Sequence, residues 1–448
     1  MFKQLFSLQG LRRTGESKSS VRHLPLLSLL AALVAVLATG LVIAFRLVIE
    51  WSHNIILGVT HTEINDLLDW QRFLIPLCGA GLVALTGYLL KVDGRMVGTS
   101  HVMYRSRQDN PKMPSRNALM QFIGGGIALS SGSPGGWLGP SMHIGATGSS
   151  MVYRHFDLPD DSIRTLLAAG VAAAITACID TPIAGLVLAC EVVLLQFRIL
   201  SFVPVMLAAG ISSVIMYVTK FPPLIAFPEF HSEIYAITDF LIILPAGIVL
   251  GLFSAGFNYS IEITSTVRIE NFTIRCLIVG LVVGIAAWLW PSLMGSGFEV
   301  FNFGLAHWQS WTLLALTGYI LLKLMLVSVS VGFGMPVGIM GPSLVTGAVF
   351  GVLMYKAVGL LMPGAELPSL AFYMLIGACA MFSTVLNAPL AALITVLELS
   401  GEPKLMFPAM LLIVVANLTS ALTYGQNSVF ASRLRIMREA DRANRQEI

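Results

Sequence analysis

The sequence predicts an all-α polytopic membrane protein, and three observations support this fold class. First, 56% of the 448 residues are hydrophobic and 11% are charged, whereas soluble domains carry about 25% charged residues. Second, apolar stretches broken by glycine and proline follow one another along most of the chain. Third, a pattern of glycine, proline and serine occurs twice, which indicates a duplicated architecture.

The duplicated pattern has the same residue types at the same spacings in both copies. The first copy comprises Gly132, Pro134, Gly136, Gly139, Pro140, Ser141 and Gly145, and the second Gly334, Pro336, Gly338, Gly341, Pro342, Ser343 and Gly347. A further set of anchors, Gly170, Pro182 and Glu191, recurs as Gly377, Pro389 and Glu398. Duplicated halves with apolar segments broken in this way are typical of transporters whose site lies between the repeats.

The apolar stretches give the expected helices. They fall near residues 24–49, 73–90, 117–131, 143–153, 163–178, 183–195, 200–218, 237–260, 273–292, 311–332, 343–361, 369–385, 390–399 and 405–424. Only some reach the roughly 20 residues that a straight span needs, so we expect tilted helices and half-helices that meet within the membrane. The first stretch is too long for a signal peptide and is interpreted as a retained transmembrane helix.

Polar segments divide the chain into four expected parts. These are a cytoplasmic N-terminal segment (1–23), a first transmembrane repeat (24–265), a second transmembrane repeat (266–432) and a short cytoplasmic tail without a regulatory domain (433–448). The boundary between the repeats is placed at the polar link 266–275. Basic residues gather before the first span and after the last, and such flanks favour the cytoplasm, so both termini are expected there.

The composition also argues against several functions. A net charge of +3 is too small to indicate a nucleic-acid partner, and the five cysteines form no CxxC pair. The sequence contains no HExxH zinc motif, no GxSxG nucleophile motif and no P-loop. We therefore expect no enzyme, no metal and no cofactor. The remaining enzyme alternative is an intramembrane hydrolase that pairs Ser130 or Ser131 with His143.

Two glycine- and proline-rich clusters, which we call the first elbow (132–140) and the second elbow (334–342), each precede an apolar stretch. Proline suits the first turn of a helix, and glycine lets a backbone approach a ligand closely. Each elbow is therefore expected to end in a helix N-terminus inside the membrane, with free N–H groups directed at a ligand. Two such ends would bind an anion without a full positive charge, which allows fast release. The alternative is that these glycines only permit close helix packing.

Over residues 25–436 the chain resembles the CLC family of chloride channels and proton-coupled chloride antiporters. In chain order, the similar segments are 98–102 for the family's G-S-G-I-P motif, 136–140 for G-R/K-E-G-P, 181–185 and 388–392 for A-P-L-A/T-G, and 334–342 for G-x-P-x-G-I-F-x-P. The family's late tyrosine falls on Phe430, or on Val429 if the alignment shifts by one residue.

The resemblance implies two repeats of inverted topology, made of tilted and broken helices. It also implies a homodimer with one pore per subunit, a bound chloride or similar anion, and a place in the lipid bilayer of a bacterial inner membrane. The implied anion path comprises Gly98, Thr99, Ser100, Trp137, Leu138, Gly139, Gly338, Ile339, Met340 and Phe430. Thr99 keeps the hydroxyl that a serine supplies in the family, whereas Phe430 lacks the tyrosine hydroxyl.

The functional prediction rests on two departures from the family. The glutamate of G-R/K-E-G-P is the family's outer gate and proton carrier, and here the gate position is Leu138. The antiporters use a second, inner glutamate that follows another glutamate; here Glu191 keeps the preceding position and Val192 occupies the inner one. Proton relay through a membrane needs titratable side chains. We therefore predict passive chloride conduction that is uncoupled from protons.

Two other transport hypotheses stay open. His143 follows Leu138 by five positions and could be a pH sensor or the substitute proton carrier of a coupled antiporter. His101, two residues after Thr99, could likewise line the pore, or it could be a loop or packing residue. Alternatively, Leu138 and Met340 could plug the pore of a non-conducting pseudo-transporter. For Glu398 we expect a structural role in capping or pairing near a helix end.

Overall fold

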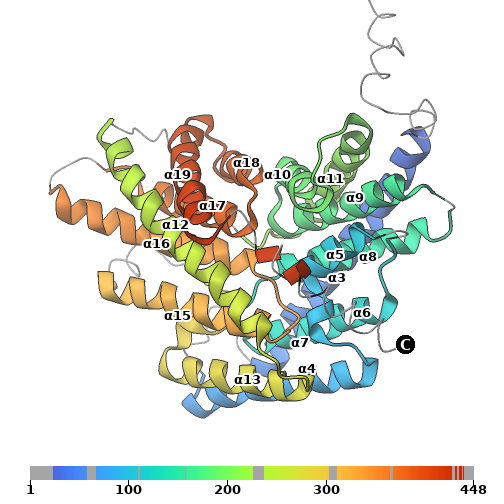
Figure 1. The fold of residues 1–448 in the computed structure, drawn as a ribbon, viewed down its shortest axis with the longest axis horizontal. Coiled ribbons are helices and arrows are strands. Elements are labelled where there is room, and N and C mark those ends of the chain that lie inside the picture. The colour runs from blue at the N-terminus through green and yellow to red at the C-terminus, as the bar shows by residue number, and fades with distance from the viewer. Residues whose placement is uncertain are drawn as a thin grey trace, which may run out of the picture.

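A computed structural model describes residues 24–57, 67–108, 111–156, 158–225, 237–301, 310–363, 367–425, 429–430, 433–435 and 437. Within these residues the regular structure is helical, apart from one isolated bridge between Gly136 and Gly338 (Figure 1). Nine of the described helices are long and apolar enough to cross a membrane. The prediction of an all-α polytopic membrane protein is confirmed. The expected cytoplasmic segment 1–23 and most of the tail 433–448 lie outside the described residues.

In the first half of the chain, long helices alternate with short and broken ones. The elements are α3 (Leu24–Leu57), α4 (Asp69–Leu90), η3 (Gly94–Met96), α5 (Gly98–Ser106), α6 (Ser115–Leu119), η4 (Met120–Gly124), α7 (Gly125–Ser130), α8 (Leu138–Tyr153), α9 (Asp160–Ile179), α10 (Pro182–Leu188), η5 (Ala189–Leu194) and α11 (Ile199–Thr219). Two of them, η4 and η5, are π-helical turns that continue α6 and α10. Single π-helical turns inside longer helices often occur at functional sites.

The second half repeats this order of long and short helices. The elements are α12 (Ile237–Thr266), α13 (Phe272–Leu289), η6 (Pro291–Leu293), η7 (Phe298–Phe301), α15 (Leu313–Gly332), α16 (Met340–Leu361), α17 (Leu370–Leu386), α18 (Pro389–Ser400), η8 (Pro403–Leu405) and α19 (Met406–Tyr424). Several of these are shorter than a straight span, as the lengths of the apolar stretches predicted.

Equivalent residues of the duplicated sequence occupy equivalent places in the fold. The C-cap residues that follow α9 and α17, Asp180 and Asn387, both have left-handed φ angles, 52° and 56°. Pro182 and Pro389 are then the first residues of α10 and α18, the position where proline is well tolerated. The repeat detected in the sequence is therefore a repeat of backbone geometry.

The packing of α12 describes how it is held in the fold. α12 packs mainly against α15, α17 and α19, and α3 packs against α8, α9 and α11. The polar link at 266–275 joins α12 to α13. The boundary between the repeats that was placed at this link stays a prediction.

Close contacts between glycines hold the buried helices of each half together. A Cβ atom on Gly145 of α8 would lie 2.3 Å from the carbonyl oxygen of Gly170 on α9. In the second half, a Cβ atom on Gly347 of α16 would lie 2.4 Å from the carbonyl oxygen of Gly377 on α17. Small residues allow such close approach of helices in membranes. The packing alternative thus explains Gly145 and Gly347, the last glycine of each copy of the motif.

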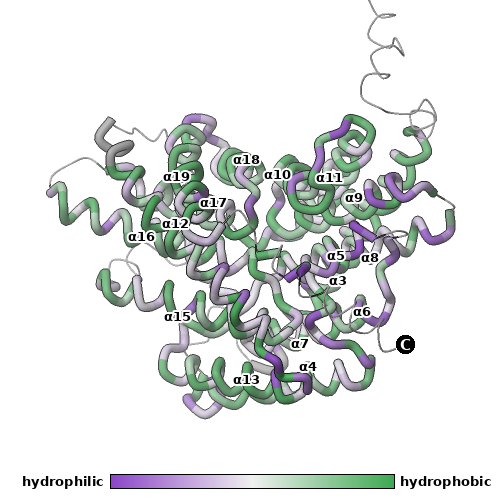
Figure 2. Tube along the Cα trace, viewed as in Figure 1, coloured by the Kyte–Doolittle hydropathy of each residue, from purple (hydrophilic) through white to green (hydrophobic). Residues whose placement is uncertain are grey.

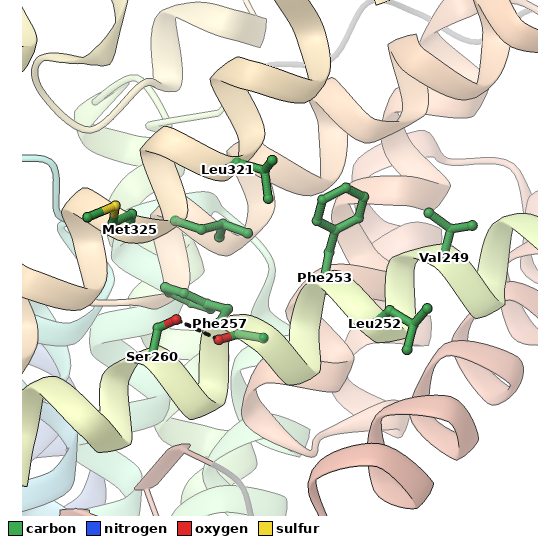
Figure 3. Close-up of a pocket in the computed structure, with 9 residues that line it drawn as sticks. Val249, Leu252, Phe253, Phe257, Ser260, Leu321 and Met325 are labelled. Atoms are coloured by element: carbon green, nitrogen blue, oxygen red, sulfur yellow. Dashed lines mark hydrogen bonds between the residues drawn. The ribbon is translucent and has the colours of Figure 1, made fainter. Parts of the chain in front are cut away.

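The outer helices expose apolar side chains. Figure 2 shows hydrophobic residues along much of α4 and α13, and Leu29, Trp70 and Trp288 are more than half exposed. A groove of about 430 Å³ between α12 and α15 has an apolar lining, to which Phe253 of α12 and Leu321 of α15 contribute (Figure 3). Lipid chains are the natural surroundings of such a surface.

Candidate functional site

The two elbows have the same backbone conformation. Gly132 opens the first with a φ of 81°, and Gly334 opens the second with a φ of 90°. Glycine favours this region because it has no Cβ atom. In each elbow the next residue donates its N–H to a carbonyl of the preceding helix, at 3.0 Å in the first and 2.9 Å in the second. The chain thus turns back in the same way at the ends of α7 and α15.

The elbows meet directly. The N–H of Gly136 donates to the carbonyl of Gly338 at 2.7 Å, and the N–H of Gly338 donates back to the carbonyl of Gly136 at 2.9 Å. A Cβ atom on Gly136 would lie 2.7 Å from the nitrogen of Gly341, and one on Gly338 would lie 2.7 Å from the nitrogen of Gly139. Only glycine at both positions therefore allows the two backbones to pair.

A buried helix begins two residues after each pairing glycine. α8 starts at Leu138 and α16 at Met340, and both residues are buried. Within the described part of the chain, the N–H groups of Leu138, Gly139, Ile339, Met340 and Gly341 have no hydrogen-bond acceptor. Buried polar groups in folded proteins are nearly always paired. Two adjacent sets of free N–H groups are thus available to a ligand of negative charge.

A third helix start lies beside these two. Gly98, at the beginning of α5, has a φ of 77°. The hydroxyl oxygen of the next residue, Thr99, lies 3.5 Å from the Cβ position of Gly139 and donates to the sulfur of Met142 at 3.6 Å. The buried hydroxyl of Ser100 has no hydrogen-bond partner among the described residues. Thr99 therefore adds a hydroxyl group close to the paired elbows, and the unpaired hydroxyl of Ser100 follows it in α5.

The remaining predicted site residues are all buried. Trp137 directly precedes α8, and Val192 lies in the π-helical turn η5. Phe430 and its alternative Val429 are equally buried, so burial does not choose between them for the family's tyrosine position. Leu138 and Val192, which the resemblance aligns with the family's proton-transfer glutamates, are apolar side chains in an apolar core.

The two histidines singled out in the sequence are in contact. Nδ1 of His101 lies 3.0 Å from Nε2 of His143, with the rings stacked at 23° and 5.3 Å between centroids. Both side chains are buried, and Nδ1 of His143 has no partner within the described residues. A bond between two ring nitrogens needs one donor and one acceptor, so the pair holds at most one extra proton. No linear pattern predicts this contact, since the residues lie on different helices.

The geometry gives no support to the hydrolase alternative. The hydroxyl of Ser130 donates to the carbonyl of Gly126 at 2.8 Å, and that of Ser131 to the carbonyl of Ala128 at 3.1 Å. Nε2 of His143 is engaged by His101. An activated serine needs a base within hydrogen-bond reach of its hydroxyl, and neither serine has His143 there.

Two polar residues that the sequence analysis did not select support the elbows. Gln121, in the π-helical turn η4, donates from Nε2 to the carbonyl of Pro336 in the second elbow at 2.8 Å. Lys323 of α15 is fully buried and donates to the carbonyl of Gly295 at 2.8 Å. Gly295 in turn donates its N–H to the carbonyl of Gly132 in the first elbow at 2.8 Å. A polar residue inside an apolar stretch is the signal that could have identified them.

Comparison with known proteins places this geometry in a family. The profile described as "Voltage gated chloride channel" (Voltage_CLC) matches residues 78–421. A relative from Ralstonia nicotianae, named "Putative chloride channel protein ClcB-like", is 28% identical and covers 82% of this chain and 86% of its own. A relative from Vibrio parahaemolyticus, named "H(+)/Cl(-) exchange transporter ClcA", is 25% identical and covers 94% and 91%.

Solved structures agree on the fold. The structure described as a slow cyanobacterial Cl⁻/H⁺ antiporter superposes with a TM-score of 0.77 at 19% identity, over 93% of this chain and 98% of the other. The structure of a CLC-type fluoride/proton antiporter gives a TM-score of 0.74 at 20% identity, over 92% and 98%. Because the Voltage_CLC profile matches residues 78–421, more than half of the sequence, the chain belongs to the CLC family of voltage-gated chloride channels and antiporters.

Proposed function

We propose that this chain conducts chloride or a related small anion passively across the membrane, through the site where α5, α8 and α16 begin. Family membership alone does not separate a channel from an exchanger, because the relatives carry both names. The distinction must come from the residues of this chain.

The proposal for an anion rests mainly on the paired elbows. The reciprocal hydrogen bonds between Gly136 and Gly338 hold the free N–H groups of two buried helix starts side by side. Partial positive charges from N–H groups and helix dipoles attract an anion, and the donor set described above contains no lysine or arginine that would bind it strongly. Weak binding at several donors favours fast passage. The hydroxyls of Thr99 and Ser100 would complete the donor set.

The proposal for uncoupled transport rests on Leu138 and Val192. A leucine at the start of α8 neither carries a proton nor competes with the anion for the N–H groups, as a carboxylate would. A valine in η5 likewise offers no acid or base at the inner position. Without titratable groups at both positions, the route by which the family's antiporters move protons is interrupted.

A flux assay tests conduction. Purified protein is reconstituted into liposomes loaded with chloride, a potassium ionophore clamps the membrane potential, and chloride efflux is followed with an electrode. We expect efflux well above that of empty liposomes. The matched variant Gly338→Ala, which separates the elbows, should lose most of this efflux. No efflux from the wild-type protein would favour the non-conducting hypothesis, in which Leu138 and Met340 plug the pore.

A second candidate function is a proton-coupled antiporter that uses the His101–His143 pair. The observation in its favour is the 3.0 Å contact between two buried imidazoles close to the start of α8. It requires the pair to take up and release a proton in each cycle. Chloride-driven proton movement through the liposome membrane, abolished by His143→Gln, would support this function over passive conduction.

We also infer a homodimer with one pore per subunit and cytoplasmic termini, in a bacterial inner membrane. These inferences rest on the family and on the basic flanks of the spans. Mass measurement of the detergent-solubilised protein tests the homodimer. Protease accessibility of a C-terminal tag in inside-out vesicles tests the cytoplasmic position of the C-terminus.

A further inference from the structure

Three arginines from distant parts of the chain gather around one carboxylate. Arg275, fully buried at the start of α13, binds Asp93 through Nη2 and donates from Nη1 to the carbonyl of Phe333 at 3.1 Å. Arg95, in η3, donates from Nη2 to the carbonyl of Val267 at 2.9 Å. Arg433 lines the same small cavity as Arg95. Three positive charges and one negative charge leave this cluster with an excess of two positive charges.

Two acidic groups that lie near the cluster in the sequence, Asp93 and Glu262, are already engaged. Asp93 binds Arg275 and also accepts the N–H of Arg95 at 2.8 Å. Glu262, one turn before the end of α12, binds Arg435 and the hydroxyl of Tyr424. No hydrogen bond or ion pair joins Arg433 to a described residue. An arginine in a partly buried place without an acidic partner is costly unless an anion accompanies it.

A small cavity lies among these groups. Its lining includes Arg95, Ser265, Gly332, Arg433 and Met437, and it has room for roughly one water-sized particle. Ser265 is 5% exposed, and its hydroxyl has no hydrogen-bond partner within the described residues. Nε of Arg95 is also buried and unpaired there. Unpaired donors of a serine and an arginine, together with a second guanidinium, form a donor set suited to a small anion.

The cavity lies next to the elements that form the proposed pore. η3 leads through Val97 into the start of α5, and a Cβ atom on Gly94 would lie 1.9 Å from the carbonyl oxygen of Gly334. A Cβ atom on Gly334 would in turn lie 3.0 Å from the nitrogen of Arg95. The cluster is thus built onto both the start of α5 and the beginning of the second elbow.

We propose that Arg95, Ser265 and Arg433 form a second anion-binding site, which holds one small inorganic anion such as chloride beside the pore on the side of the C-terminal segment. The inference deepens the proposed function and rests on it: the second site raises the local anion concentration where the path opens. It differs from the paired elbows in using full positive charges, so it should bind more tightly and depend more on ionic strength.

Bromide tests the site directly, because it replaces chloride and gives anomalous X-ray scattering. Crystals of the full chain grown in bromide should show one peak among Arg95, Ser265 and Arg433 and another at the paired elbows. Arg433→Gln should remove the first peak. Arg435→Gln is the matched control, since Arg435 pairs with Glu262 outside the cavity lining, and should keep both peaks. A peak at the elbows without one in the cavity overturns this inference alone; no peak at either overturns both proposals.

A solution measurement keeps the inference testable if Arg433→Gln fails to fold. Calorimetric titration of the wild-type protein with bromide should resolve two classes of site. Arg433→Gln should weaken one class about tenfold, as expected for the loss of a charged hydrogen-bond donor. Ser265→Ala, a milder change, should weaken the same class about threefold. A single class of site that neither substitution affects contradicts the inference, whatever the flux assay gives.

Discussion

Glu191 and Glu398 each cap the helix that carries the other. The carboxylate of Glu191, at the end of α10–η5, accepts the N–H groups of Leu390 (3.1 Å) and Ala391 (2.9 Å) at the start of α18. The carboxylate of Glu398, on α18, accepts those of Ile183 (2.8 Å) and Ala184 (2.7 Å) at the start of α10. The reciprocal arrangement confirms a structural role for Glu398 and extends it to Glu191. These four hydrogen bonds relate the two repeats by an approximate two-fold symmetry.

Removing either cap should destabilise the protein without changing its transport. We expect Glu398→Ala and Glu191→Ala each to lower the free energy of unfolding by about 1 kcal/mol, because a charged acceptor leaves a helix N-terminus. Thermal unfolding in detergent measures the effect. The control is Glu402→Ala, since Glu402 makes no side-chain cap hydrogen bond. Equal melting temperatures for all three variants would show that the caps contribute nothing.

Adding one methyl group to Gly338 should separate the elbows. The new Cβ atom would lie 2.7 Å from the nitrogen of Gly139, so the backbones must move apart and both hydrogen bonds to Gly136 must weaken. We expect chloride efflux to fall at least tenfold, with a loss of stability of about 1–3 kcal/mol. Gly256→Ala, at a site with no atom within 4 Å of the new Cβ, should keep wild-type efflux. Unchanged efflux in Gly338→Ala would argue against a path at the elbows.

A carboxylate at position 138 should act as a gate. In Leu138→Glu the ionised side chain can occupy the free N–H groups at the start of α8 and compete with the anion. Efflux should therefore be low at pH 7.5 and recover when acid neutralises the carboxylate. Leu138→Gln, of similar size but without charge, should show no such dependence. If Leu138→Glu conducts equally at pH 7.5 and in acid, residue 138 does not lie on the anion path.

Passive conduction predicts that efflux from the wild-type protein varies little between pH 5.5 and 8. His101 and His143 are fully buried against each other. Adding a proton to such a pair costs free energy because no carboxylate among the described residues is bonded to either ring. His143→Gln should leave this flat profile unchanged. The control is His155→Gln, on an exposed histidine at the end of α8. Acid-dependent efflux lost in His143→Gln and kept in His155→Gln would favour the coupled antiporter.

The second anion site should have its own pH dependence. Burial and, to a smaller extent, the neighbouring Arg95 lower the pKa of Arg433 to about 10, while Asp93 acts in the opposite direction. The guanidinium therefore stays charged at neutral pH and loses its proton only as the pH rises through that value. Bromide binding to the cavity should be constant from pH 6 to 9 and weaken above pH 10. Weakening already between pH 6 and 9 would point to a different group.

The sequence predicted most of what depends on local chemistry. The duplicated glycines and prolines correctly placed the starts of α8 and α16, because left-handed glycines and prolines in a first turn leave a readable pattern. The spacing of Pro182 and Pro389 likewise marked two further helix starts. These features need only neighbouring residues to form.

What the sequence did not predict depends on residues that are distant in the chain. The Gly136–Gly338 pairing, the His101–His143 contact and the arginine cluster each join different helices, and no periodic pattern records which helices will meet. The packing partners of α12 are not recorded in the sequence either: it packs mainly against α15, α17 and α19.

The most direct test of passive, uncoupled anion conduction is the reversal potential of the reconstituted protein. With a tenfold chloride gradient and equal pH on both sides, we predict a reversal potential of about 59 mV, the value for a single charge. A pH gradient added to the same membrane should not move it. A reversal potential that is smaller and shifts with the pH gradient would mean that protons are transported with the anion, and would contradict the account.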